Sequence, residues 1–145
     1  MKRVLFIFLL FVTLFACNNK KSTHSSAAQT DSLLCELHER DQQIRHELMR
    51  VQRAFIAEQR AELVDSIVML VEEEERTDSL NRVVVDSLLQ NGWPEGLSEQ
   101  SNQTIWLIID HGDVEYQERY LHLIEQQAMR GIISLADYAT LSDRV

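Results

Sequence analysis

The stretch LLCELHERDQQIRHELMRVQRAF, residues 33–55, decides the fold. On a helix its apolar residues fall within about 100° of one another, which is the pattern of an amphipathic helix. These residues are Leu33, Leu34, Leu37, Ile44, Leu48, Val51 and Phe55. Asp31 is placed to cap the helix start. The chain continues without a breaker to Val71, so the pattern predicts one helix of up to about forty residues or a bend near Gln59.

Shorter helices are predicted in the rest of the chain. The acidic run Glu72–Glu75 reads as a solvated helix end, and a second helix is predicted from Thr77 or Asp78 to Gly92. A turn follows at Gly92-Trp93-Pro94, and three further helices are expected, capped by Ser98, Asp113 and Ser134. With one proline and four glycines in 145 residues, the predicted class is all-α: a small bundle of about five helices with a long first helix.

The N-terminus carries the pattern of an export signal. Lys2 and Arg3 precede the apolar run 4–16, which ends in the small residue Ala16. As a helix this run would span about 20 Å, short of a hydrocarbon core of roughly 30 Å, so it is predicted to be a leader and not a membrane span. Leu14-Phe15-Ala16-Cys17 resembles the lipobox of bacterial lipoproteins.

That resemblance implies that residues 1–16 are a signal peptide and that Cys17 is lipidated by acyl chains such as palmitate. Two or more acyl chains give stable membrane attachment. The expected location is the envelope of a Gram-negative-type bacterium, with the protein anchored to the outer membrane and its domain in the periplasm. An ordinary secreted protein with a stray cysteine is the alternative.

After Cys17, the segment 18–30 has no large apolar residue and is rich in Ser, Thr, Asn and Lys. This composition predicts a flexible tether, in which His24 is solvated. The remaining residues, 31–145, are predicted to form one helical domain.

Charge excludes several classes of function. Without Lys2 and Arg3, 12 basic residues remain against 23 acidic ones, a formal net charge of −11, and no lysine follows Lys21. P-loop, Schiff-base and kinase chemistries all use a lysine amine, and nucleic-acid binding depends on basic residues that neutralise phosphates. We therefore expect no nucleic-acid partner.

Cys35 has no second cysteine to pair with once Cys17 is lipidated. It falls opposite the apolar stripe of its helix, so it is predicted to be exposed. It could link two copies in an oxidising envelope or stay a free thiol.

The order of short motifs resembles a domain-of-unknown-function family of bacterial proteins, many of them envelope lipoproteins. The motifs are Arg40-Asp41-Gln42-Gln43-Ile44-Arg45, Gly92-Trp93-Pro94, Trp106-Leu107-Ile108-Ile109-Asp110-His111-Gly112-Asp113, Tyr116-Gln117 and Leu141-Ser142-Asp143-Arg144-Val145. The family has no established activity, so the resemblance implies no reaction. This chain departs from the family at Asp110, Gly112 and Gln100-Ser101, and it stops at Val145, where family members continue. If that tail completes a pocket, we expect this chain to lack the pocket.

Polar residues at apolar positions suggest a site. Asp41 lies inside the apolar stripe and needs a buried partner, which Arg45 could provide. A catalytic interpretation makes His111 a general base or ligand, oriented by Asp113 or Asp110, with Arg144 binding an anion. A structural interpretation makes the same residues a clasp, in which Asp113 caps a helix and Asp41 pairs with an arginine; this is favoured because caps and ion pairs are common where helices meet.

No metal site and no cofactor are predicted. His38-Glu39 and His46-Glu47 each begin like a zinc-binding helix motif, but neither first histidine has another four residues later. Trp93 and Trp106 are expected to pack in turns or core. Two hypotheses result: a non-catalytic interaction or accessory module that binds a protein partner or a second copy, and a small hydrolase-like envelope enzyme that uses His111 with Asp113 or Asp110.

Overall fold

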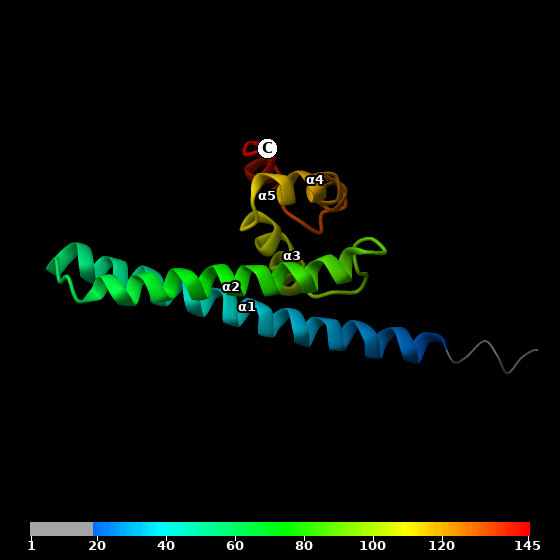
Figure 1. Ribbon diagram of the computed structural model, residues 1–145. Helices are drawn as coiled ribbons and strands as arrows, with labels where there is room; N and C mark the ends of the chain where they lie inside the picture. The colour runs from blue at the N-terminus through cyan, green and yellow to red at the C-terminus, as the bar shows by residue number, and fades with distance from the viewer. Residues whose placement is uncertain (1–18) are drawn as a thin grey trace, which may run out of the picture.

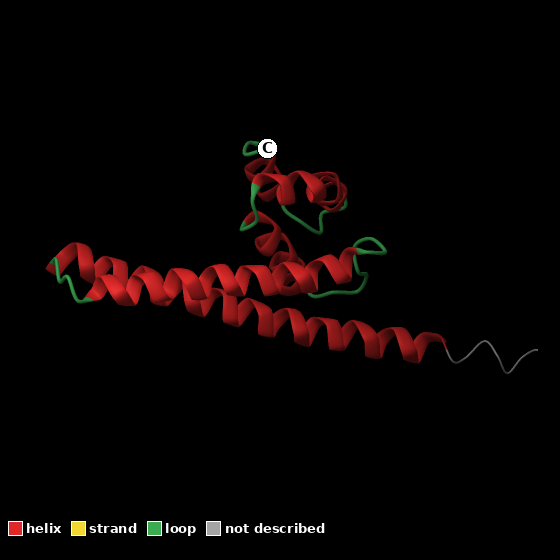
Figure 2. Ribbon diagram, viewed as in Figure 1, coloured by secondary structure: helices red, strands yellow, loops and turns green. Residues whose placement is uncertain are grey.

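The computed structural model describes residues 19–145, with side chains from Ser26 onward. Its elements are α1 (Asn19–Glu58), α2 (Leu63–Leu89), α3 (Glu99–Asp110), α4 (Val114–Met129) and α5 (Leu135–Ser142). Within residues 19–145 there is no strand, so the prediction of an all-α fold with a long first helix is confirmed (Figure 2). The leader and the lipobox cysteine Cys17 lie outside the described residues. None of the helices in the described part combines the length and the apolar character that a membrane crossing requires.

Two parts make up the structure. α1 and α2 form a long antiparallel hairpin, and α3, α4 and α5 form a head that stands on one side of it (Figure 1). The end of the hairpin that contains its turn extends well past the head (Figure 1). We call this extension, residues 47–75, the arm.

The start of α1 differs from the prediction of a flexible tether. The backbone is helical from Asn19, so residues 19–30 continue the helix instead of forming a coil. Ala27, Ala28 and Gln29 are good helix formers, and extending an existing helix costs far less than starting one. Asp31 is therefore not a cap: its carboxylate accepts hydrogen bonds from the backbone N–H of Ser98 at 3.0 Å and from the Ser98 hydroxyl at 3.2 Å.

The bend near Gln59 is confirmed as a full reversal of the chain. Gln59 has a φ of 49°, in the left-handed region that ends helices, and α2 begins at Leu63. The predicted break at Glu72–Glu75 is wrong, because α2 continues to Leu89. Arg45 binds Glu74 and Arg76 binds Glu73, which offsets the negative charge, and the side chain of Thr77, in the next turn, is buried.

The predicted caps of the last three helices are confirmed. The side-chain oxygens of Ser98, Asp113 and Ser134 accept hydrogen bonds from backbone N–H groups three residues later. At the end of α2, Gly92 has a φ of 94° and donates its N–H to the carbonyl of Leu89. The left-handed backbone explains why glycine stands there.

The core lies where the head meets the hairpin. It contains the buried residues Leu34, Leu37, Val85, Leu89, Trp93, Ile105, Trp106, Ile108, Ile109, Tyr116, Ile124, Ile133 and Leu141. The Nε1–H group of Trp93 donates to Asn102 Oδ1 at 2.7 Å, and that of Trp106 donates to the Asp137 carbonyl at 3.3 Å. Both tryptophans therefore serve packing, as predicted. Cys35 was predicted to be exposed, but it is half-buried. The reason is that α1 contacts both α2 and α3, so these helices cover a wider part of the α1 surface than the apolar stripe alone.

Candidate functional site

Asp41 is the centre of a charged cluster between the two long helices. Its side chain is 1% exposed and accepts from Gln42 Nε2 at 2.9 Å. Arg45, one turn later, lies 3.3 Å from it through Nε and binds Asp78 Oδ1 at 2.6 Å through a terminal nitrogen. The same guanidinium binds Glu74, so one arginine serves three carboxylates from two helices.

His111 brings the head into contact with this cluster. It follows α3, and its Nδ1 lies 3.4 Å from Asp41 Oδ1, with 19% of the side chain exposed. This distance is long for a hydrogen bond and becomes an ionic contact when the imidazole is protonated. We name Asp41, Arg45, Glu74, Asp78 and His111 the junction cluster, since they join α1, α2 and the α3–α4 turn.

The junction cluster keeps Asp41 ionised. Burial by itself would raise the pKa of Asp41, because it disfavours the charged carboxylate. The contacts with His111 and Arg45 outweigh burial, so the pKa lies below its ordinary value of 3.8. At neutral pH the buried group is therefore a carboxylate paired with a guanidinium.

The other candidate residues are divided among different contacts. Arg144 binds Asp110 Oδ1 at 2.6 Å and so ties the C-terminal end of the chain to the end of α3. Asp113 caps α4, and its carboxylate lies 3.8 Å from Arg82. The carboxylate beside His111 is thus that of Asp41, and neither Asp110 nor Asp113 takes that place.

Sequence reasoning missed Glu74 and Asp78. Both lie on the α1-facing side of a continuous α2, four residues apart. The predicted helix break at Glu72–Glu75 assigned the two residues to different helices, so they were not expected to share a face. Treating residues 63–89 as one helix would have placed both carboxylates on one face of that helix.

One group of side chains in the described part has metal-ligand spacing. Ligand atoms of Asp41, Asp78 and His111 all lie within 4.8 Å of one another. However, the terminal nitrogen of Arg45 that binds Asp78 also lies 3.4 Å from Asp41 Oδ1. The guanidinium supplies the positive charge that two ionised carboxylates require, which supports the clasp interpretation over a site for a cation.

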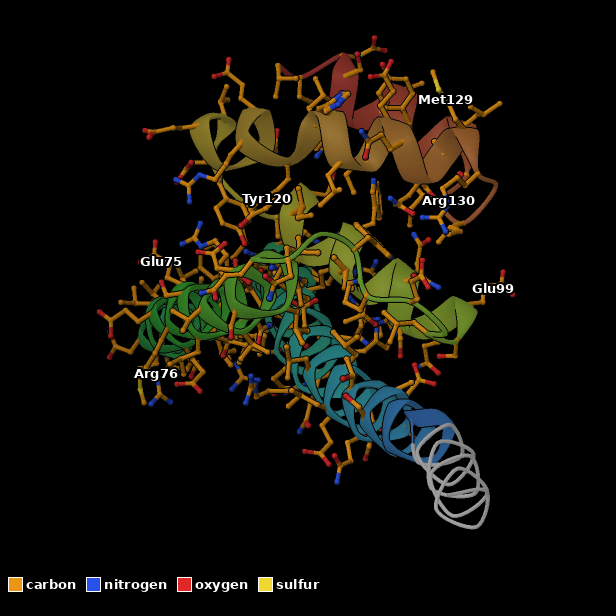
Figure 3. The ribbon with its side chains drawn as sticks, turned by 90° about the vertical axis from the view of Figure 1, so that its right-hand side faces the viewer. Glu75, Arg76, Glu99, Tyr120, Met129 and Arg130 are labelled. Atoms are coloured by element: carbon orange, nitrogen blue, oxygen red, sulfur yellow. The ribbon has the colours of Figure 1, made fainter. Side chains whose placement is uncertain are left out.

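Two tyrosines of α4 form a second contact between head and hairpin. Figure 3 shows Tyr120 on the side of α4 that faces the hairpin, where its hydroxyl donates to Asp86 Oδ1 at 2.7 Å. Burial, followed by the hydrogen bond to Asp86, raises the pKa of Tyr120 to about 12. Tyr116 donates to the Arg82 carbonyl at 3.4 Å, and its ring packs edge-on against Tyr120.

Gly112 allows Tyr116 to pack against the α3–α4 turn. A Cβ at Gly112 would lie 2.5 Å from Tyr116 Cδ1 and 3.0 Å from the Ile109 carbonyl oxygen. We expect Gly112→Ala to lower the free energy of unfolding by about 1–3 kcal/mol, the usual cost of overpacking, as measured by urea denaturation. Val114→Ala, at an exposed neighbour, is the control with little expected change. Equal stability of the Gly112 variant and the native chain would contradict this role.

No protein-family model, curated protein or solved structure matches this chain. The fold and the junction cluster define a class in structural terms only: a helical hairpin with a three-helix head clasped to one end. The arm exposes apolar residues, and the three carboxylates of the junction cluster are paired with Arg45.

Proposed function

We propose that this protein is a lipid-anchored cell-envelope module that acts by binding another protein through the arm, without catalysis. The observation that supports this most is the exposed apolar surface of the arm, which the head does not cover (Figure 1). Ile56 is 74% exposed and Met69 70% exposed. The other exposed apolar residues of the arm are Met49, Val64 and Val68. Several exposed apolar residues gathered on one element are typical of an interaction surface.

The arm also has an apolar hollow between its helices. A space of about 460 Å³ is lined by Val51, Ala54, Leu63, Ser66, Met69 and Leu70, with Glu47, Arg50 and Glu73 at its edge. Ala54 and Ser66 are small, so the two helices leave a gap there. A hollow of this kind can accept a protruding apolar side chain of a partner.

The anchor would place the arm away from the membrane. Under the lipoprotein interpretation Cys17 carries the lipid, and α1 begins at Asn19. A helix from Asn19 to Glu58 is about 60 Å long at 1.5 Å per residue. Such a length would allow the arm to reach a partner in the periplasm while the anchor stays in the outer membrane.

A small hydrolase-like enzyme is the second candidate. The contact between His111 Nδ1 and Asp41 Oδ1 favours it, because a carboxylate beside Nδ1 orients an imidazole in many general bases. Asp113, which this hypothesis also uses, lies beside Arg82 instead. Asp41 is already paired with Arg45, so a structural role for the contact between Asp41 and His111 is better supported than a catalytic one.

The test compares two surfaces in the native host. Val64→Gln with Val68→Gln changes the arm, while Val83→Gln changes an exposed valine of α2 outside the arm. After cross-linking of intact cells and electrophoresis, we expect the native chain and the Val83 variant to migrate in a larger complex and the arm variant to lose it. His111→Ala should retain the complex and carry the same metal content as the native chain. A complex that survives the arm changes would contradict the proposal, and a bound metal lost with His111 would favour the enzyme.

A further inference from the structure

We infer that the arm binds an amphipathic helix of a different protein, with apolar side chains against Val64 and Val68 and lysine or arginine side chains opposite Glu72 and Glu75. This rests on the proposed function of the arm and identifies the chemistry of its partner.

The binding face continues a surface that already holds a helix. Residues at the same side of α2, spaced by three, four or seven, form a single row: Val64, Val68, Val71, Glu75, Arg82 and Asp86. At one end of this row, Tyr116 and Tyr120 of α4 reach Arg82 and Asp86. At the other end, in the arm, the head does not cover the row (Figure 1).

The uncovered end of the row is apolar. Val68 is 51% exposed and Val64 is also exposed, four residues apart on adjacent turns. On α1 a parallel row begins at Arg45, whose guanidinium points to Asp78, and continues to the exposed Met49 and Ile56. Both rows therefore lie on the junction side of the hairpin. Val64 and Val68 on α2 give an apolar strip of the kind that a helix with apolar residues at i, i+3 or i+4, and i+7 can cover.

Unpaired acidic residues flank the strip. Within the described residues, Asp65, Glu72 and Glu75 form no ion pair, whereas Glu73 and Glu74 are bound by Arg76 and Arg45. From Val64 to Glu75 the strip and its acidic flank extend about 17 Å, or three helical turns. Basic side chains on the partner complement these carboxylates.

The same charges disfavour a second copy. Residues 47–75 carry eight acidic and three basic side chains, so two arms brought together would each contribute a net negative charge. Like charges placed opposite one another oppose association. The partner is therefore expected to be a different protein with a basic-flanked helix.

The experiment uses the chain from Asn18 to Val145, which keeps every described residue, and two synthetic helical peptides of about four turns. Both peptides carry leucines at i, i+4 and i+7; one has flanking lysines and the other flanking glutamates. By fluorescence anisotropy at low salt, we expect binding of the lysine peptide alone, weakened at least about tenfold when salt is raised.

Two double variants test the face itself. Val64→Gln with Val68→Gln, and Glu72→Gln with Glu75→Gln, should each weaken binding about tenfold, while Val83→Gln and Glu118→Gln should not. Equal binding of both peptides, or equal loss in the control variants, overturns the inference. If the chain formed dimers through the arm and bound neither peptide, the inference of a basic helical partner would be wrong, while the proposed function of the arm would stand. If the cross-linked complex in cells were unaffected by the arm variants, both the inference and the proposed function would be wrong.

Discussion

Replacing Arg45 with methionine is expected to lower the free energy of unfolding by about 3–5 kcal/mol at pH 7. Asp41 would stay buried without its guanidinium, and Asp78 and Glu74, which the same arginine binds, would add negative charge nearby. Among the described residues, His111 is the one basic side chain that would still contact Asp41. Urea denaturation monitored by circular dichroism measures the effect.

The pH dependence of the variant should have the opposite sign to that of the native chain. The native pKa of Asp41 is lowered, so its contribution to stability is present above 3.8 and is lost as the pH falls through the folded pKa. Without Arg45, burial and neighbouring carboxylates would raise this pKa. The stability difference between variant and native chain should therefore shrink from pH 7 to pH 5.

Arg50→Met is the matched control for Arg45. Arg50 lies on the same helix and pairs with Glu47, but it is 67% exposed. Water and salt screen an exposed ion pair, so the loss of stability should be small and the pH profile native-like. Equal losses in the two variants, or an unchanged pH slope for the Arg45 variant, would show that the junction cluster does not stabilise the fold.

Replacing Trp106 with alanine is expected to cost about 3–5 kcal/mol, the usual range for a buried aromatic residue. The indole is buried in the core between head and hairpin, and its Nε1–H group binds the Asp137 carbonyl in α5. Its removal takes away apolar packing and the link to α5 at the same time. Urea denaturation gives the size of the loss.

Two further variants, one at Trp106 and one at the next residue, separate the contribution of the indole from that of nearby packing. Trp106→Phe keeps most of the ring and loses the hydrogen bond, so we expect a loss of about 1–2 kcal/mol. Leu107→Ala, at a half-buried neighbour, should cost less than the alanine variant of Trp106. If all three changes had the same cost, the indole would not have the specific role that its contacts indicate.

Local signals in the sequence predicted the parts of the fold that depend on a few adjacent residues. Ser98, Asp113 and Ser134 were identified as caps because a cap acts on the N–H group three residues later. The reversal near Gln59 was one of two alternatives. Likewise, the position of Asp41 in an apolar stripe was enough to predict a partner for its carboxylate, and Arg45, one turn away, was within reach of that reasoning.

Other predictions failed because they judged a segment by its composition alone. Residues 19–30 are polar, yet they extend a helix that is already formed. The run Glu72–Glu75 is repulsive in isolation, yet Arg45 from another helix and Arg76 from the next turn neutralise part of it. In both places a contact or a preceding helix outweighed the local preference.

By itself, the sequence determined that the chain is helical, where three of the helices begin, and that Asp41 must be paired. Only the tertiary structure decided that α2 is continuous, that His111 meets Asp41 while Asp110 meets Arg144, and that the arm is left uncovered. The reason is range: capping and helix periodicity act within one or two turns, whereas burial and ion pairing depend on segments brought together from distant parts of the chain.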